Sequence, residues 1–172
     1  MKKNLFLVCL FMFGTLASCQ CSSKKSADNA VVNTTETPVP LGDPFILLHD
    51  GVYYAYGTHS NKGIEFYTSD DLLTWKYGGL ALNKEDSWAD RWFWAPEIYF
   101  VNGKFYMYYS ADEHICVAVA DSPTGPFVQD KKEPMIADEK CIDNSLFIDD
   151  NGTPYLSFVP VSYTHLRAHE TR

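Results

Sequence analysis

The stretch Ile46-Leu47-Leu48-His49-Asp50-Gly51-Val52-Tyr53-Tyr54-Ala55-Tyr56 contains two short apolar runs separated by Asp-Gly. This pattern predicts a β-hairpin, because Asp-Gly favours the tight turns that join antiparallel strands. Residues 98–109 repeat the pattern around Asn102-Gly103, and residues 146–158 repeat it around Asn151-Gly152. The body of the chain is therefore predicted to consist of short strands, with no helical period.

The turn glycines Gly51, Gly103 and Gly152 are 52 and 49 residues apart. A self-similar period of about 50 residues with about four strands per unit is typical of a β-propeller, in which each unit is one blade. Further strands are expected at 64–69, 74–79, 114–120 and 127–130. A β-sandwich also joins short strands but needs no such repeat. We therefore predict an all-β propeller, with about two and a half blades, over residues 41–160.

Alignment of the three units on their turn glycines places Asp43, Ala95 and Asp143 at equivalent positions. Asp43 and Ala95 each lie eight residues before the turn glycine, and Asp143 lies nine before a turn that is one residue longer. These residues begin the first strand of each unit, and in a propeller that strand lines the central channel. Two of the three units therefore direct a carboxylate toward the axis.

Carboxylates around a pocket suit the cleavage of glycosidic bonds. One must be ionised, to activate water or attack the anomeric carbon, and another must be protonated, to help the leaving oxygen depart. Neighbouring carboxylates push their pKa values apart, so one site can hold both states. Taken singly, Asp43 also fits an Asp-Pro turn and Asp143 a cap at the start of a strand. Their shared repeat position favours the catalytic interpretation.

At these residues the sequence resembles glycoside hydrolase family 43, a family of five-bladed propellers. The resemblance is carried by the order and spacing of motifs across about residues 41–160. They are Gly42-Asp43-Pro44-Phe45-Ile46, Ser69-Asp70-Asp71-Leu72-Leu73-Thr74-Trp75, Trp94-Ala95-Pro96-Glu97-Ile98, Asp121-Ser122-Pro123-Thr124-Gly125-Pro126-Phe127, and Ile142-Asp143 through Tyr155-Leu156.

The resemblance implies roles for individual residues. Asp43 matches the family's general base, which activates water for attack with inversion. Asp143 matches the carboxylate that raises the pKa of the general acid, a Glu on a later blade that is missing from this chain. Trp94 is implied to help shape the sugar pocket. Asn144 departs from the Pro or Ala that the family often has, which would alter the start of the strand.

The implied substrates are xylo- and arabino-configured plant polysaccharides or their fragments. No cofactor and no metal site is predicted, because no Cys or His pair has metal-ligand spacing; a structural calcium, found in some family members, stays open. The formal net charge of -8 argues against nucleic acid as a partner. Two alternatives to an enzyme are a non-catalytic, surface sugar-binding propeller and a structural propeller that uses its rim.

Several other side chains are assigned to structure rather than chemistry. Glu97 is expected to be a structural polar residue, although it could approach the pocket. Trp75 and Trp88 are expected to pack, while residues 88–93 form an aromatic loop that could line a cleft. Cys116 and Cys141 are predicted to be small core residues, and a disulfide between them is the alternative.

The N-terminus predicts export. The basic start Met1-Lys2-Lys3 and the apolar run Leu5–Phe13 indicate a signal peptide over residues 1–18. Leu16-Ala17-Ser18-Cys19 resembles a bacterial lipobox, so Cys19 is the expected lipidation site; an ordinary signal peptide is the alternative. Residues 19–40 are predicted to be a flexible linker. The expected location is a bacterial membrane, by lipid anchor, on the periplasmic side or the cell surface.

Residues 161–172 break the strand pattern within the third unit. They resemble one reading frame of a transposase-type sequencing adapter, and a natural basic tail is the alternative. On the first interpretation the gene continues beyond Pro160, and the general acid lies in that continuation.

We predict that the 172-residue polypeptide is poorly soluble and inactive, because an open ring leaves unpaired strand edges and lacks the general acid. Expression followed by assay on aryl xylosides and arabinofuranosides checks this. Soluble protein with clear turnover would contradict it.

Overall fold

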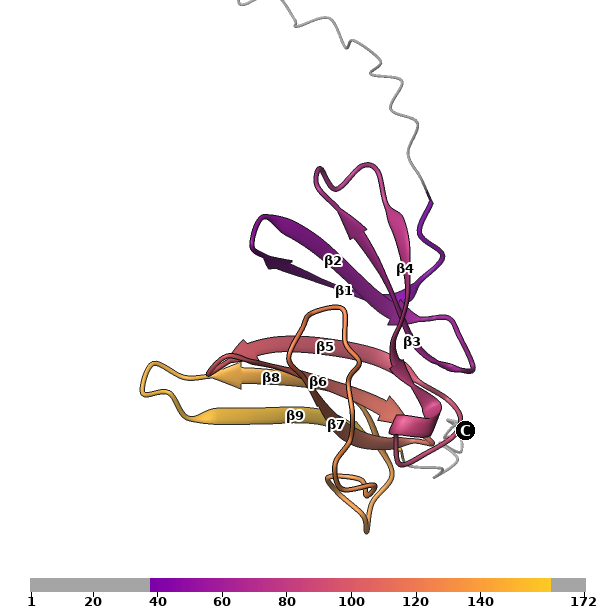
Figure 1. Cartoon of the computed structure of the whole chain (residues 1–172). Helices are drawn as coiled ribbons and strands as arrows, with labels where there is room; N and C mark the ends of the chain where they lie inside the picture. Colours follow the sequence, from indigo (N-terminus) through magenta and orange to yellow (C-terminus); the bar gives the residue numbers. More distant parts are fainter. Residues whose placement is uncertain (1–37, 162–172) are drawn as a thin grey trace, which may run out of the picture. The chain divides into compact units, whose positions relative to one another are not determined.

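The computed structural model of the chain describes residues 38–161, which form three antiparallel sheets in chain order. The first sheet contains β1 (Gly42–His49), β2 (Val52–Thr58), β3 (Gly63–Ser69) and β4 (Lys76–Asn83). After a 3-10 turn at Lys84–Asp86, the second sheet contains β5 (Trp94–Val101), β6 (Lys104–Ala111) and β7 (His114–Ala120). The third contains β8 (Cys141–Ile148) and β9 (Pro154–Pro160). Within each sheet, every strand pairs with its neighbour in sequence (Figure 1).

The sheets follow one another as successive blades. Their first strands lie next to each other, since β5 contacts β1 on one side and β8 on the other. Both residues of Asp50-Gly51 and of Asn102-Gly103 have positive φ, as two-residue hairpin turns of this type require. The all-β, propeller-type fold predicted from the repeat is therefore confirmed for the described residues.

The first strand of each sheet carries a β-bulge at the same place. The register shifts after Gly42 in β1, after Trp94 in β5 and after Ile142 in β8, and each time two residues oppose one on the partner strand. The first bulged residue is left-handed in all three, with φ of 45° at Asp43, 43° at Ala95 and 55° at Asp143. The three positions aligned by sequence thus share one unusual backbone conformation.

Two predicted strands differ from the structure. The strand expected at 74–79 begins at Lys76 and runs to Asn83. The delay arises because Asp71 Oδ1 accepts the backbone N–H groups of Thr74, at 2.7 Å, and Leu73, at 2.9 Å, which closes a turn. These bonds hold the pKa of Asp71 below its usual value.

The strand expected at 127–130 is reduced to isolated bridges because its backbone is shared between two sheets. Phe127 N–H donates to Ala81 of β4 at 2.8 Å, whereas Val128 and Val119 of β7 exchange two bonds of 3.0 Å. The Gln129 N–H donates to the Asp86 carbonyl at 2.9 Å. The segment therefore ties the outer strand of the second sheet to the end of the first.

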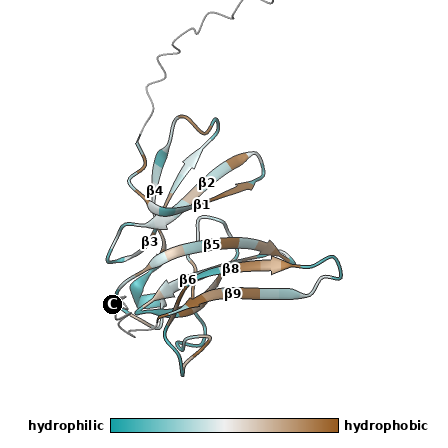
Figure 2. Cartoon of the chain, turned by 180° about the vertical axis from the view of Figure 1, so that it is seen from behind, coloured by the Kyte–Doolittle hydropathy of each residue, from teal (hydrophilic) through white to brown (hydrophobic). Residues whose placement is uncertain are grey.

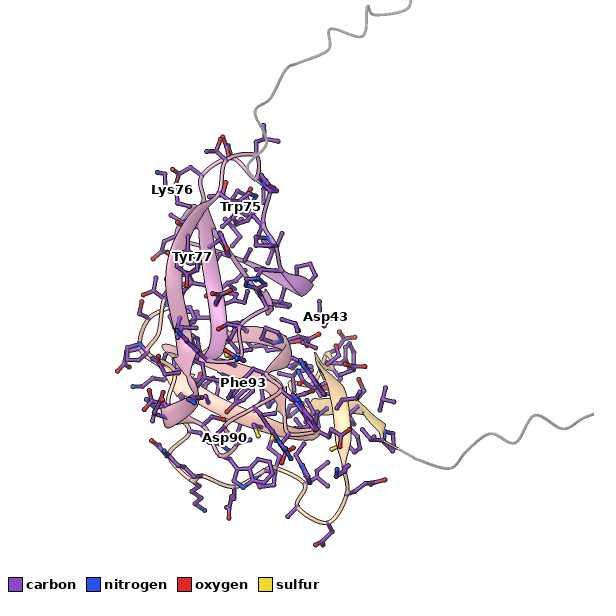
Figure 3. All side chains as sticks on the ribbon, turned by 90° about the vertical axis from the view of Figure 1, so that its right-hand side faces the viewer. Asp43, Trp75, Lys76, Tyr77, Asp90 and Phe93 are labelled. Carbon is purple, nitrogen blue, oxygen red and sulfur yellow. The ribbon has the colours of Figure 1, made fainter. Side chains whose placement is uncertain are left out.

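One continuous core joins the first two sheets. It includes the fully buried Tyr56, Phe93, Met107 and Tyr109. Figure 3 shows Phe93 within the packed side chains. Cys116 and Cys141 are buried free thiols, so the prediction that they are core residues is confirmed and the alternative disulfide is not formed.

The third sheet exposes large apolar side chains. Phe147 and Tyr155 are 65% and 55% exposed, and Figure 2 shows hydrophobic stretches along β8 and β9. Among residues 38–161, no helix is long and apolar enough to cross a membrane. The predicted signal peptide, Cys19, nearly all of the linker and residues 162–172 of the tail lie outside the described residues, and those predictions stand as such.

We predict that Ala95→Gly stabilises the protein by about 1 kcal/mol, because glycine removes the cost of a left-handed Cβ at φ 43°. The matched change Ala118→Gly, in the buried middle of β7, should instead destabilise by about 1 kcal/mol or more. Urea unfolding of both variants, made in the protein at its full natural length, compares them. Equal destabilisation by the two changes would contradict a strained Ala95.

Candidate active site

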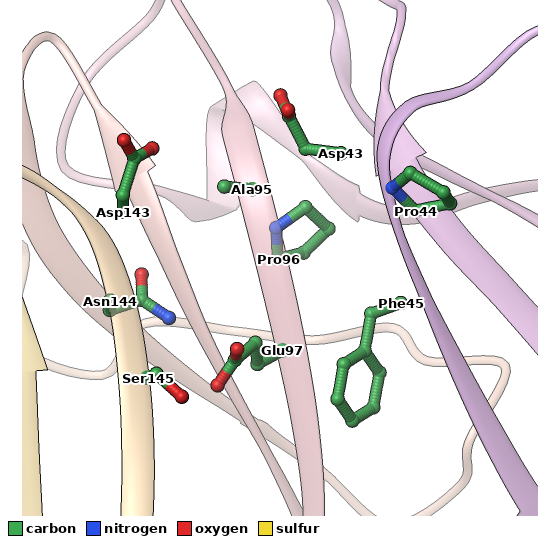
Figure 4. Close-up of a pocket in the computed structure, with 9 residues that line it drawn as sticks. All are labelled: Asp43, Pro44, Phe45, Ala95, Pro96, Glu97, Asp143, Asn144 and Ser145. Atoms are coloured by element: carbon green, nitrogen blue, oxygen red, sulfur yellow. The ribbon is translucent and has the colours of Figure 1, made fainter.

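A pocket of about 370 Å³ lies where the bulged starts of β1, β5 and β8 meet (Figure 4). Each strand supplies three consecutive residues. The lining residues are Asp43, Pro44, Phe45, Ala95, Pro96, Glu97, Asp143, Asn144 and Ser145. Its size is within the range of small-molecule sites.

Equivalent residues from the three blades line the pocket at three successive positions. The first position holds the left-handed residues Asp43, Ala95 and Asp143, the second Pro44, Pro96 and Asn144, and the third Phe45, Glu97 and Ser145. Figure 4 shows both aspartate carboxylates pointing to the same end of the pocket, with Glu97 further along it. The bulge is what turns these side chains into the pocket.

Asp43 and Asp143 are both exposed at the pocket, as the repeat alignment predicted. Asp43 Oδ2 accepts a hydrogen bond of 2.9 Å from the Thr58 hydroxyl, which fixes the carboxylate, while Oδ1 has no hydrogen-bond partner among residues 38–161. Ala95 occupies the equivalent place between them and brings no charge. The two carboxylates therefore belong to one pocket but to different, non-adjacent blades.

A hydroxyl at the end of the second strand connects each blade to the next. Thr58 Oγ1 accepts the backbone N–H of Ala95 at 3.0 Å, and Ser110 Oγ accepts that of Asp143 at 3.2 Å. Each hydroxyl thus holds the left-handed residue of the following blade. Neither residue was predicted from the sequence, although each lies seven residues after its turn glycine, where the third unit has Val159.

Glu97 lies in the pocket and also has a structural role. Its Oε2 accepts the Tyr99 hydroxyl at 2.5 Å and the backbone N–H of Leu146 at 3.3 Å, so it joins β5 to β8. Burial, together with the hydrogen bond to Glu97, raises the pKa of Tyr99 to about 12, which keeps this phenol a donor. The prediction of a structural polar residue agrees with these bonds, and its place at the pocket adds a third carboxylate.

None of the nine lining residues carries a positive charge, while three carry carboxylates. Such a pocket disfavours anions and suits neutral ligands whose hydroxyl groups can donate to carboxylates. Its carboxyl groups are also of the kind that general acid–base catalysis uses.

Comparison with known proteins identifies the family. The sequence model of glycosyl hydrolases family 43 matches residues 35–170. The chain belongs to this family. The match spans the bulged strands and both aspartates of the pocket.

Three relatives illustrate the match. The xylosidase/arabinosidase 43A of Humicola insolens is 40% identical, over 71% of this chain and 44% of its own length. The crystal structure of an endo-1,4-β-xylanase from Bacteroides thetaiotaomicron is 50% identical, with a TM-score of 0.66, over 70% of this chain and 43% of that chain. The GH43_1 enzyme of Xanthomonas citri, solved with xylose, is 32% identical, with a TM-score of 0.58, over 67% and 39%. The chain thus spans less than half the length of these family 43 proteins.

Phe45 is the one aromatic residue among the nine that line the pocket of this family 43 chain, and no tryptophan is among them. The ring of Trp94 stacks on that of Trp92, at 5.7 Å between centroids, and neither is among the lining residues. Trp92 is 43% exposed and carries the Arg91 guanidinium 4.3 Å from its ring centre. The role of Trp94 in sugar binding stays a prediction.

The contacts of the remaining tryptophans, Trp75 and Trp88, are those of packing or turn residues. Trp88 packs edge-on against the His114 ring at 5.0 Å. Trp75 donates to the Leu72 carbonyl at 3.1 Å within its own turn, and Figure 3 shows it well away from Asp43.

Thr58→Val should cost about 1–3 kcal/mol of stability, because it leaves the Ala95 N–H without its partner and releases Asp43. Thr58→Ser keeps the hydroxyl and should restore most of the loss. Denaturant midpoints of the variants, made in the protein at its full natural length, give the comparison.

The control for Thr58→Val is Thr68→Val, because the Thr68 hydroxyl makes no hydrogen bond within residues 38–161. It should be nearly neutral. If the two valine variants were equally stable, Thr58 would not be holding the next blade.

Proposed function

We propose that the protein, at its full natural length, hydrolyses glycosidic bonds in xylan- or arabinan-type saccharides. The observation that carries this is the placement of Asp43 and Asp143 at equivalent bulges in one pocket. Membership of family 43 supports it, as do the relatives described as a xylosidase/arabinosidase and a xylanase.

In this proposal Asp43 is the general base. Its carboxylate is exposed to the pocket and held at Oδ2 by Thr58, so Oδ1 is free to take a proton from water. The water attacks the anomeric carbon as the glycosidic bond breaks, which inverts the configuration. The bond from Thr58 lowers the freedom of the carboxylate and so favours one attack geometry.

Asp143 is proposed to act through the general acid rather than on the sugar. A carboxylate near a second carboxyl group raises the pKa of that group and keeps it protonated. The acid lies outside the residues that the structure describes. Ser110 holds the backbone of Asp143, and the bulge directs its side chain to the pocket end where Asp43 also points.

Asp43→Asn is expected to lower kcat at least about a thousandfold, because the amide cannot accept the proton from water. The measurement is hydrolysis of aryl xyloside and arabinofuranoside by the protein at its full natural length, with the product anomer followed by NMR. Saccharide binding without turnover in the unmutated protein would favour the non-catalytic sugar-binding alternative.

Asp143→Asn should act differently on the pH profile. Without the neighbouring negative charge the pKa of the general acid falls, so the alkaline limb of kcat/KM moves to lower pH. A lowered rate with an unmoved alkaline limb would overturn this role for Asp143 and leave that of Asp43 intact.

A further inference from the structure

Asn144 is a polar residue at a bulge position where the other two sheets have proline. At the second position of the bulge, β1 has Pro44 and β5 has Pro96, neither of which has a side-chain hydrogen-bonding group. In β8 the same position holds Asn144, and its side chain lines the pocket between Asp143 and Ser145 (Figure 4). The departure from proline therefore brings a carboxamide to the wall of the candidate active site.

This carboxamide is buried and has no partner. Asn144 is 3% exposed, and neither Oδ1 nor Nδ2 has a hydrogen-bond partner within residues 38–161. Other buried polar side chains there do have partners: Ser110 accepts from Asp143, and Gln129 from Trp88. A buried polar group without a partner is destabilising, and it persists where something else satisfies it.

The pocket itself indicates what that partner is. Figure 4 shows the Asn144 amide nitrogen directed toward β5, on the side where Pro96 and Glu97 lie. The pocket is lined by three carboxylates, which only accept hydrogen bonds when ionised, and Asn144 supplies the sole side-chain N–H among its nine residues. A sugar hydroxyl can donate to a carboxylate and accept from the amide at the same time.

We infer that Asn144 is a sugar-binding residue that holds a hydroxyl group of the ring seated beside Asp43 and Asp143. The inference rests on the proposed function for the identity of the ligand. The terminal torsion of asparagine is broad, so a rotation about the Cβ–Cγ bond turns an amide atom into the pocket when the sugar arrives. Binding then satisfies a polar group that the empty pocket leaves unpaired.

The test compares two amides in one hairpin. Asn144→Leu keeps the side-chain size but removes both polar atoms, and Asn151→Leu is the matched control in the exposed β8–β9 turn. Both are made with Asp43→Asn in the protein at its full natural length, and the dissociation constants for xylose and xylobiose are measured by calorimetry. Asn144→Leu should weaken binding about tenfold or more, and Asn151→Leu should leave it unchanged.

Stability separates this role from a structural one. Asn144→Leu removes unpaired buried polar atoms, so its Tm should be equal to or above that of the parent. In NMR titrations the side-chain amide signals of Asn144 should shift with xylose. A weaker Kd accompanied by a large fall in Tm, or an unchanged Kd, overturns the inference.

The outcomes for hydrolysis are distinct. If the protein with Asp43 intact hydrolyses xylosides while Asn144→Leu leaves KM and Kd unchanged, the inference fails and the proposed function stands. If xylose binding depends on Asn144 but no substrate is hydrolysed, the inference stands and the proposed function fails. If no saccharide binds and none is hydrolysed, both fail.

Discussion

The left-handed residue at the start of each blade is the constraint on which the site depends. A non-glycine residue in this conformation costs free energy, and it persists only where its surroundings hold it. Here the hydroxyl of the preceding blade supplies that hold, through Thr58 to Ala95 and Ser110 to Asp143. The bulge that follows turns the side chain into the pocket. The same local device thus builds the repeat and positions the carboxylates.

The left-handed bulge position accepts different side chains, so the backbone conformation does not depend on the chemical group that it presents. Ala95 has the same backbone conformation as Asp43 and Asp143 without a carboxylate, so the conformation belongs to the fold. Asp is common in the left-handed region because its short polar side chain can bond locally. The fold therefore presents equivalent positions around the pocket, and the sequence decides which become acidic.

The parts of the structure that were predictable from sequence are those set by local patterns. Two-residue turns of this type require positive φ, so Asp50-Gly51 and Asn102-Gly103 revealed two of the hairpins. The spacing of Gly51, Gly103 and Gly152 then revealed the equivalence of Asp43 and Asp143. Thr58 and Ser110 were missed because their bonds run between sheets and depend on how the blades meet. The prediction of a strand at 127–130 was wrong for the same reason, because Phe127 bonds to the neighbouring sheet. Glu97 was expected to be a structural residue that could approach the pocket, and the assembled structure shows that it does both.

Residues 127–129, which bond to Ala81, Val119 and Asp86, affect how the protein unfolds locally. The backbone of this segment bonds to β4 at Ala81, to β7 at Val119 and to the 3-10 turn at Asp86, so it links the outer strands of the two sheets. In an array of independent repeats, each unit frays by itself and stability rises in steps along the chain. Here residues 127–129 bond to both of the first two blades, and these blades share one core, so we expect them to open as a single cooperative unit in hydrogen exchange. We therefore expect the pocket wall formed by β1 and β5 to be lost or kept as a whole.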